Sequence, residues 1–248
     1  MKIFLYCFLV LVVLSCKKSD VDVVGQDTVL DEYPDWYTLK APVDHTISGV
    51  WGNYDKTVLV STMFKLFRTT DQGRHWQQVH ERSIGMIGVV QYRDTLFTMT
   101  GLTSGTNSGI YQEVLIHAGD YSVDDGKTWE IYKGRNPVLR DNPRYDSPDK
   151  FLINPITAPN KVTYQINKVY LKGPNATDGA FETPGVVKST GERINLPQLH
   201  QLESLYLDDQ QRLYIVGSDA LCGSGNSIKF CNSKSGRGVV YVSRKSLP

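Results

Sequence analysis

An eight-residue pattern that occurs twice constrains the fold of this chain more than any other feature of its sequence. The pattern is Ser/Thr-x-Asp-x-Gly-x-(Thr/His)-Trp, and the two copies begin at Thr69 and Ser122, 53 residues apart. Apolar, alternating segments flank both copies, which is typical of β-strands. A unit that repeats at this spacing predicts an array of similar small β-sheets.

The residue types of the pattern suit a tight turn followed by a strand. An Asp side chain can accept hydrogen bonds from the backbone N–H groups of its own turn, and Gly permits a positive φ. The Trp is expected to begin an outer strand and to bury its ring between neighbouring sheets. We therefore predict structural, not catalytic, roles for the shared residues. They are Thr69, Asp71, Gly73, Trp76, Ser122, Asp124, Gly126 and Trp129.

This pattern resembles the Asp-box, or BNR repeat, of the sialidase and sortilin-like superfamily and of other β-propellers. The resemblance implies an all-β propeller domain over residues 35–248. The stretch from Trp36 onward holds four blades of about 53 residues each, or five if residues 130–150 contain strands.

Alternation and turn signals divide the domain into four groups of strands. The predicted strands are 47–51, 58–61, 65–68, 86–90, 96–99, 114–121, 150–154, 162–165, 185–188, 204–207, 213–216 and 238–243. Residues 189–192 occupy the place of a third motif but lack its Asp and Trp. Trp36–Leu39 resembles the Trp-led strand that follows a motif, so we expect it to complete the last blade and to hide its edge.

The first 34 residues are predicted to be a leader and a tether. An apolar run from Ile3 to Leu14 follows Lys2, and Val13-Leu14-Ser15-Cys16 resembles a bacterial lipobox. We predict a signal peptide at 1–15, acylation of Cys16, and a flexible tether at 16–34. The alternatives are an ordinary signal peptide or an uncleaved anchor, although the run is shorter than the ~20 residues of a spanning helix. The charged run that starts at Lys17 resembles the export signals of Bacteroidetes surface lipoproteins, which implies an outer-membrane or cell-surface location in a Gram-negative bacterium.

Charge and cysteine content narrow the possible partners. With 27 basic and 26 acidic residues the net charge is +1, which argues against a general nucleic-acid binder. Cys222 and Cys231 are candidates for a disulfide in an oxidising compartment, or remain free thiols. The five His residues show no paired metal spacing, so no metal or other cofactor is expected.

The predicted long connections gather at one end of the sheets, which in repeat proteins is often the binding face. Among them, residues 133–149 carry three arginines and a tyrosine that suit an anionic or sugar ligand. These candidate ligand-binding residues are Arg135, Arg140, Arg144 and Tyr145. The alternative is a solvated loop with internal salt bridges. Tyr111, Tyr121 and Tyr170 are either sugar-stacking or strand-edge residues.

The catalytic residues of sialidases do not carry over to this sequence. No Arg precedes Arg68, and the Phe/Tyr-Arg-Ile-Pro signature of that family is missing. We therefore expect a membrane-anchored, non-catalytic binding module for a glycan or protein ligand. The alternative is a glycoside hydrolase with a non-standard active site, because fold alone does not decide function.

Overall fold

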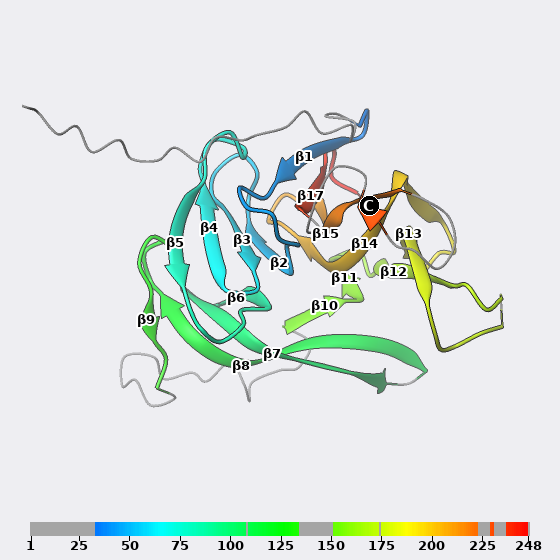
Figure 1. Ribbon diagram of the computed structural model, residues 1–248, viewed down its shortest axis with the longest axis horizontal. Helices are drawn as coiled ribbons and strands as arrows, with labels where there is room; N and C mark the ends of the chain where they lie inside the picture. Colours follow the sequence, from blue (N-terminus) through cyan, green and yellow to red (C-terminus); the bar gives the residue numbers. More distant parts are fainter. Residues whose placement is uncertain are drawn as a thin grey trace, which may run out of the picture.

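The computed structural model describes residues 33–107, 109–133, 151–173, 175–222, 229–230 and 237–247. Across these residues there are seventeen β-strands and no α-helix, and hence no helix of membrane-spanning length and hydropathy. The all-β class predicted from the sequence is confirmed. One large curled sheet and two smaller sheets make up the structure. Their strands β2, β6, β10 and β14 lie near the middle of the molecule (Figure 1).

The first small sheet is a meander in which each strand pairs with the next in the chain. Its strands are β2 (Gly49–Gly52), β3 (Val58–Thr62), β4 (Lys65–Thr69) and β5 (Gln77–Glu81). Every side chain of β3 is buried, because Val58 and Val60 pack into one apolar cluster and Leu59 into another on the opposite face. An unbroken apolar run suits a strand that is covered on both faces.

The second small sheet contains a hairpin that is much longer than predicted. Its strands are β6 (Gly88–Tyr92), β7 (Thr95–Asn107), β8 (Ile110–Ser122), β9 (Glu130–Ile131) and β10 (Leu152–Asn154). The outer half of the β7–β8 hairpin, residues 101–107 and 109–114, is called the arm below. The arm pairs with β10, through Val114 opposite Leu152 and Glu113 opposite Asn154. The strands predicted from the sequence, 96–99 and 114–121, leave out residues 100–113, a Thr- and Ser-rich segment without apolar alternation.

The large sheet has eight strands and curls at β14, because the first part of this strand pairs with β13 and its last part pairs with β15. Its strands are β11 (Ile156–Thr157), β12 (Thr163–Tyr170), β13 (Phe181–Lys188), β14 (Arg193–Leu207), β15 (Leu213–Cys222), β16 (Lys229–Phe230), β17 (Gly238–Ser243) and β1 (Trp36–Lys40). The first residues of β14 pair only with β13, and its last residues, from Ser204 to Leu207, pair only with β15. Register shifts near Leu202 lie between the two parts and mark the bend.

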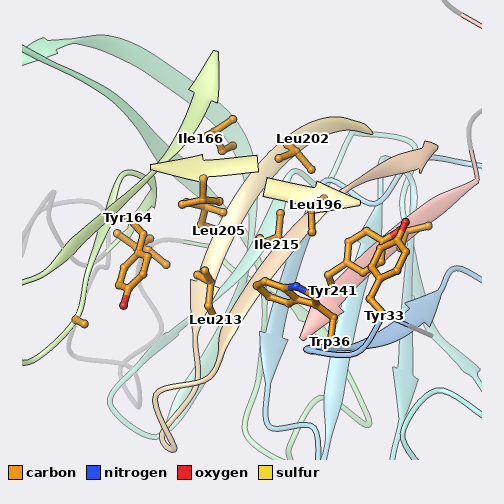
Figure 2. Close-up of a cluster of buried hydrophobic side chains, with 14 residues drawn as sticks. Tyr33, Trp36, Tyr164, Ile166, Leu196, Leu202, Leu205, Leu213, Ile215 and Tyr241 are labelled. Carbon is orange, nitrogen blue, oxygen red and sulfur yellow. The ribbon is translucent and has the colours of Figure 1, made fainter. Parts of the chain in front are cut away.

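Four clusters of buried apolar side chains hold the strands together. One separates β3 and β4 from β6 and β7, and a second joins β6–β8 to β10 and the residue before it. A third fills the space between β11–β14 and β15–β17 (Figure 2). The fourth packs β15, β17 and β1 against β2–β4. The clusters therefore pack β2–β4 against β6 and β7 on one face and against β15, β17 and β1 on the other.

The N-terminal strand β1 pairs with the last strand, β17, as expected from its Trp-led sequence. The pairing is antiparallel and runs from Trp36 opposite Ser243 to Lys40 opposite Val239. Its register matches the two motif turns, where Arg68 lies opposite Gln77 and Tyr121 opposite Glu130. The corresponding pair between β1 and β17 is Tyr37 opposite Val242. In each of the three pairs, one residue directly precedes a Ser or Thr and its partner directly follows a Trp.

The packed part of the chain includes Tyr33, which the sequence boundary had assigned to the tether. Tyr33 is 1% exposed, and its ring stacks on Tyr241 of β17 with 5.0 Å between centroids. Its hydroxyl donates a hydrogen bond to Gln198 Oε1 at 3.0 Å. Figure 2 shows the two rings side by side next to Trp36. The leader, the lipobox with Cys16, and most of the predicted tether lie outside the described residues.

We predict that Leu39→Ala lowers the free energy of unfolding by about 2–4 kcal/mol, because it empties a buried site in the cluster that joins β1 to β2–β4. Urea denaturation monitored by tryptophan fluorescence measures the change. Lys40→Ala, on the same strand but only partly buried, is the control and should change stability by less than about 1 kcal/mol. Equal stability of the two variants would show that β1 adds little to the core.

Candidate ligand-binding face

The two ends of the strands differ in the connections that they carry. Thr69 lies opposite Val58, and Ser122 opposite Leu96, so both motif turns share an end with the short turns before β3 and β7. This end is called the turn end. The opposite end, called the hairpin end, carries the arm, the β3–β4 turn and the connections after β12 and β15.

The hairpin ends of neighbouring groups face the same way. Ser204 Oγ, at the hairpin end of the last part of β14, donates to the carbonyl of Ser48 at 2.9 Å. Ser48 Oγ in turn donates to the carbonyl of Met86 at 3.2 Å. The segments that precede β2 and β6 and the hairpin end of the last part of β14 are therefore held side by side.

Most exposed large apolar side chains lie at the hairpin end. Eleven of the described residues belong to this class. Only Val123 and Ile131 lie near the turn end, next to the second motif. The other nine lie on the β3–β4 turn and the nearby loop, on the arm, and on the tips of β12 and β13; they are Met63, Phe64, Ile84, Leu102, Ile110, Tyr111, Val169, Leu171 and Phe181. Apolar surface gathered on one face is typical of an interaction site.

A polar and aromatic group forms where the arm meets β10 and β12. Lys168 Nζ lies 3.1 Å from Glu113 Oε1 and is 4.5 and 5.1 Å from the ring centroids of Tyr111 and Phe181. Asn154 Nδ2 donates to Glu113 Oε2 at 2.7 Å, and Tyr111 Oη donates to Glu113 Oε1 at 3.3 Å. These five residues, called the Lys168 cluster below, come from four different strands.

Glu203 adds a second carboxyl group near the Lys168 cluster. Burial raises the pKa of Glu203 above its usual value, the Glu113 carboxylate raises it further, and the Lys168 ammonium partly offsets both. The Glu113 carboxylate contacts the Lys168 ammonium and accepts hydrogen bonds from Asn154 and Tyr111. Two carboxyl groups in different environments at one site can act as proton donor and acceptor.

A cavity of about 160 Å³ lies where the inner strands meet. Its walls are β2, β6, the end of β14, the segment 151–153, and Leu115. The lining includes the rings of Trp51, Phe151 and Tyr206. Ser204, next in sequence to Glu203, also lines the cavity, so the cavity lies close to the polar group described above.

The sequence-predicted ligand residues lie mostly outside the described part of the chain. This holds for Arg135, Arg140, Arg144 and Tyr145, and for Cys231 and the side chain of Cys222. Among the tyrosines considered, Tyr111 belongs to the Lys168 cluster, and Tyr170 packs edge-on against Phe181 with 5.7 Å between centroids. Tyr121 donates instead to Glu130 Oε2 at 2.7 Å, near the turn end. Glu113, Asn154, Lys168 and Glu203 were missed because no local pattern shows that the arm reaches β10 and β12.

The first motif turn is stabilised by its own side chains. Asp71 Oδ1 accepts the backbone N–H of His75 at 3.0 Å, and Thr69 Oγ1 accepts the N–H of Gly73 at 3.0 Å. The hydrogen bonds that Asp71 itself accepts, chiefly from the backbone N–H of His75, lower the pKa of Asp71 to about 2. Gly73 has φ of 81°, and a Cβ there would lie 2.8 Å from Leu39 of β1. The turn therefore packs closely against the preceding group of strands.

The second motif turn repeats this arrangement. Asp124 accepts the side-chain hydroxyl of Thr128 at 2.7 Å and its backbone N–H at 3.0 Å, which lowers the pKa of Asp124 to about 2. Gly126 has φ of 75°, and a Cβ there would lie 2.6 Å from Leu59 of β3. Trp129 packs against the apolar cluster between the two small sheets. The first turn thus packs on β1 and the second on β3, and neither contributes to the cavity lining.

Comparisons with known proteins add no family. No protein-family model matches this sequence, and a search of the curated proteins found no match. Among the described residues, no three His, Cys, Asp or Glu side chains are grouped so that they could hold a metal ion.

We predict that Asp124→Ala destabilises the fold by about 1–3 kcal/mol at neutral pH, because backbone N–H groups lose their acceptor. The folded-state pKa of about 2 lies below the unfolded value of 3.8. The stabilising effect is therefore present above about pH 4 and is lost as the pH falls toward 2. Thermal melting from pH 7 to pH 2 should show the two proteins converge, whereas exposed Asp178→Ala matches the wild type throughout. A constant difference between wild type and Asp124→Ala at all pH values would contradict this role.

Proposed function

We propose that this protein is a four-bladed Asp-box β-propeller that works as a membrane-anchored binding module. Three features support the propeller: antiparallel sheets in which most strands pair with the next along the chain, apolar clusters that pack β2–β4 against β6–β7 and against β15, β17 and β1, and pairing of β1 with β17. The two motif turns, with matching hydrogen bonds and glycine conformations, support the Asp-box assignment.

The anchor follows from the sequence around Cys16 and from the position of β1. Acyl chains on Cys16 would hold the protein on the outer membrane or cell surface. β1 begins at the turn end, where Trp36 lies opposite Ser243. A tether that leads into β1 from this end leaves the hairpin end directed away from the membrane and open to ligands.

The observation that carries the binding role is the concentration of exposed apolar side chains at the hairpin end. The Lys168 cluster adds aromatic rings together with carboxylate, amide and ammonium groups. This mixture favours a glycan over a purely apolar partner, because sugars offer both C–H faces and hydroxyl groups. Arg135, Arg140 and Arg144 lie in the connection between β9 and β10 and would suit a carboxylate or sulfate on the ligand. The alternative ligand of the binding module is a protein.

One observation favours the alternative, a glycoside hydrolase. Glu203, whose pKa is raised by burial, lies near a second carboxyl group, Glu113, and glycosidases use a pair of carboxyl groups. The binding role is preferred because both oxygens of Glu113 already have partners within the chain.

The experiment is a screen of the purified protein against a panel of glycans that includes carboxylated and sulfated members. We predict binding to at least one member, with Kd raised tenfold or more in the double variant Tyr111→Ala/Phe181→Ala, which corresponds to about 1.4 kcal/mol. The matched control is Val123→Ala/Ile131→Ala, which removes the two exposed apolar side chains near the turn end and should leave Kd unchanged.

Two results would contradict the glycan-binding role. One is equal loss of affinity in both double variants, since binding would then not depend on the hairpin end. The other is turnover of chromogenic glycosides by the wild type that Glu203→Gln abolishes, which would establish the hydrolase.

A further inference from the structure

The outer half of β7 has one edge that no strand covers. β6 pairs with β7 only as far as Met99, and β8 pairs with the other edge along the whole arm. Within the described residues no further strand pairs with β7. The residues from Leu102 to Thr106 are all exposed. Backbone N–H and C=O groups on such an edge form a ready template for another strand.

The sequence of this edge lacks the usual protection against pairing. No charged residue and no proline occurs from Thr95 to Gln112. Natural edge strands are commonly kept apart by charges, prolines or shortness. Among the outer edges, β5 carries Glu81, and β9 and β11 have two residues each. The free edge of the arm has neither kind of protection.

Gly105 lies near the middle of the free edge, and no contact or backbone conformation within its own chain requires a glycine there. A Cβ at this position would meet no atom within 4 Å, and its φ is outside the left-handed region. A side chain would therefore fit in a single copy. A glycine would be required at this position if the backbone of another strand approached too closely to leave room for a side chain.

We infer that two copies of this protein pair through the free edges of β7, antiparallel and related by a two-fold axis. Full overlap of Leu102–Thr106 with itself puts Ser104 opposite Ser104 of the second copy, and Thr103 opposite Gly105. Leu102 then lies opposite Thr106, so its exposed side chain gains a cross-strand neighbour that carries a methyl group. No like charges meet, because the segment has none, and a contact that uses the same surface twice closes at two copies.

A second copy fits this edge better than a charged partner or a loose peptide. The edge offers no charge for recognition, and its polar side chains are Ser, Thr and Asn. The main-chain groups then supply the attraction, and they match any strand of the same length in antiparallel register. The pairing uses the β7 edge and leaves the Lys168 cluster, which lies against β10 and β12, available. This inference therefore does not depend on the identity of the ligand.

The first measurement is the mass of the purified full chain by light scattering during size exclusion. We expect twice the 27.9 kDa of one chain. Gly105→Lys should shift the protein to a single chain and raise the dimer Kd tenfold or more, because it places two lysines against the pairing strands. Gly105 has open space around it, so the variant should melt at the wild-type temperature. Gln77→Lys, with the same charge change on exposed β5, is the control and should remain a dimer.

The second measurement tests the register. Ser104→Cys should form a disulfide-linked dimer on a non-reducing gel, because opposite residues in an antiparallel pair lie within bridging distance. Gln77→Cys should not. A wild-type protein of single-chain mass would overturn the inference, and so would a dimer that folded Gly105→Lys leaves intact. A single-chain protein that still binds a glycan would overturn the pairing alone and leave the proposed function standing.

Discussion

The backbone pairing of β1 with β17 connects residues 36–40 to residues 239–243, and the packing of the remaining sheets depends on it. Without β1, the β17 edge would be open, and the apolar cluster shared with β2–β4 would lose Leu39. Two buried side chains next to this pair, Tyr241 of β17 and His200 of β14, also contact each other: the Tyr241 hydroxyl lies 3.1 Å from His200 Nε2. Burial lowers the pKa of His200 to about 4. His200 is therefore neutral at physiological pH and can bridge Tyr241 and the Ser218 carbonyl without a buried charge.

A second set of contacts fixes the same junction at the turn end. The rings of Tyr37 and Tyr54 stack with 4.3 Å between centroids, and the guanidinium of Arg244 lies 4.4 Å from the Tyr37 centroid. Arg212 lies on the Tyr54 side and bonds Asp208 and Asp55, so its buried charge is paired. These contacts tie together β1, Arg244 directly after β17, Arg212 directly before β15, and the β2–β3 turn. A junction that is rigid at the turn end allows the hairpin end to vary in sequence without loss of the fold.

Strong local patterns made much of the fold predictable from the sequence. Unbroken apolar runs identified β3 and β17, and the motif identified the turns at Asp71 and Asp124. The arm was not predictable in this way, because Thr, Ser, Asn and Gly pair through backbone groups that leave no apolar alternation. The Lys168 cluster depends on the arm and was missed with it. The Arg-rich connection at 133–149 lies almost entirely outside the described residues, so its ligand role stays a prediction.

Native-state amide hydrogen exchange tests the closure by β1 most directly. If β1 and β17 close the structure, the amides of β1 that bond β17 open only by global unfolding. They then exchange as slowly as those of β15 and β17, with the same dependence on denaturant. Rapid exchange of β1 at low denaturant, while β15 and β17 stay protected, would show that β1 frays independently and that the fold does not depend on this pairing.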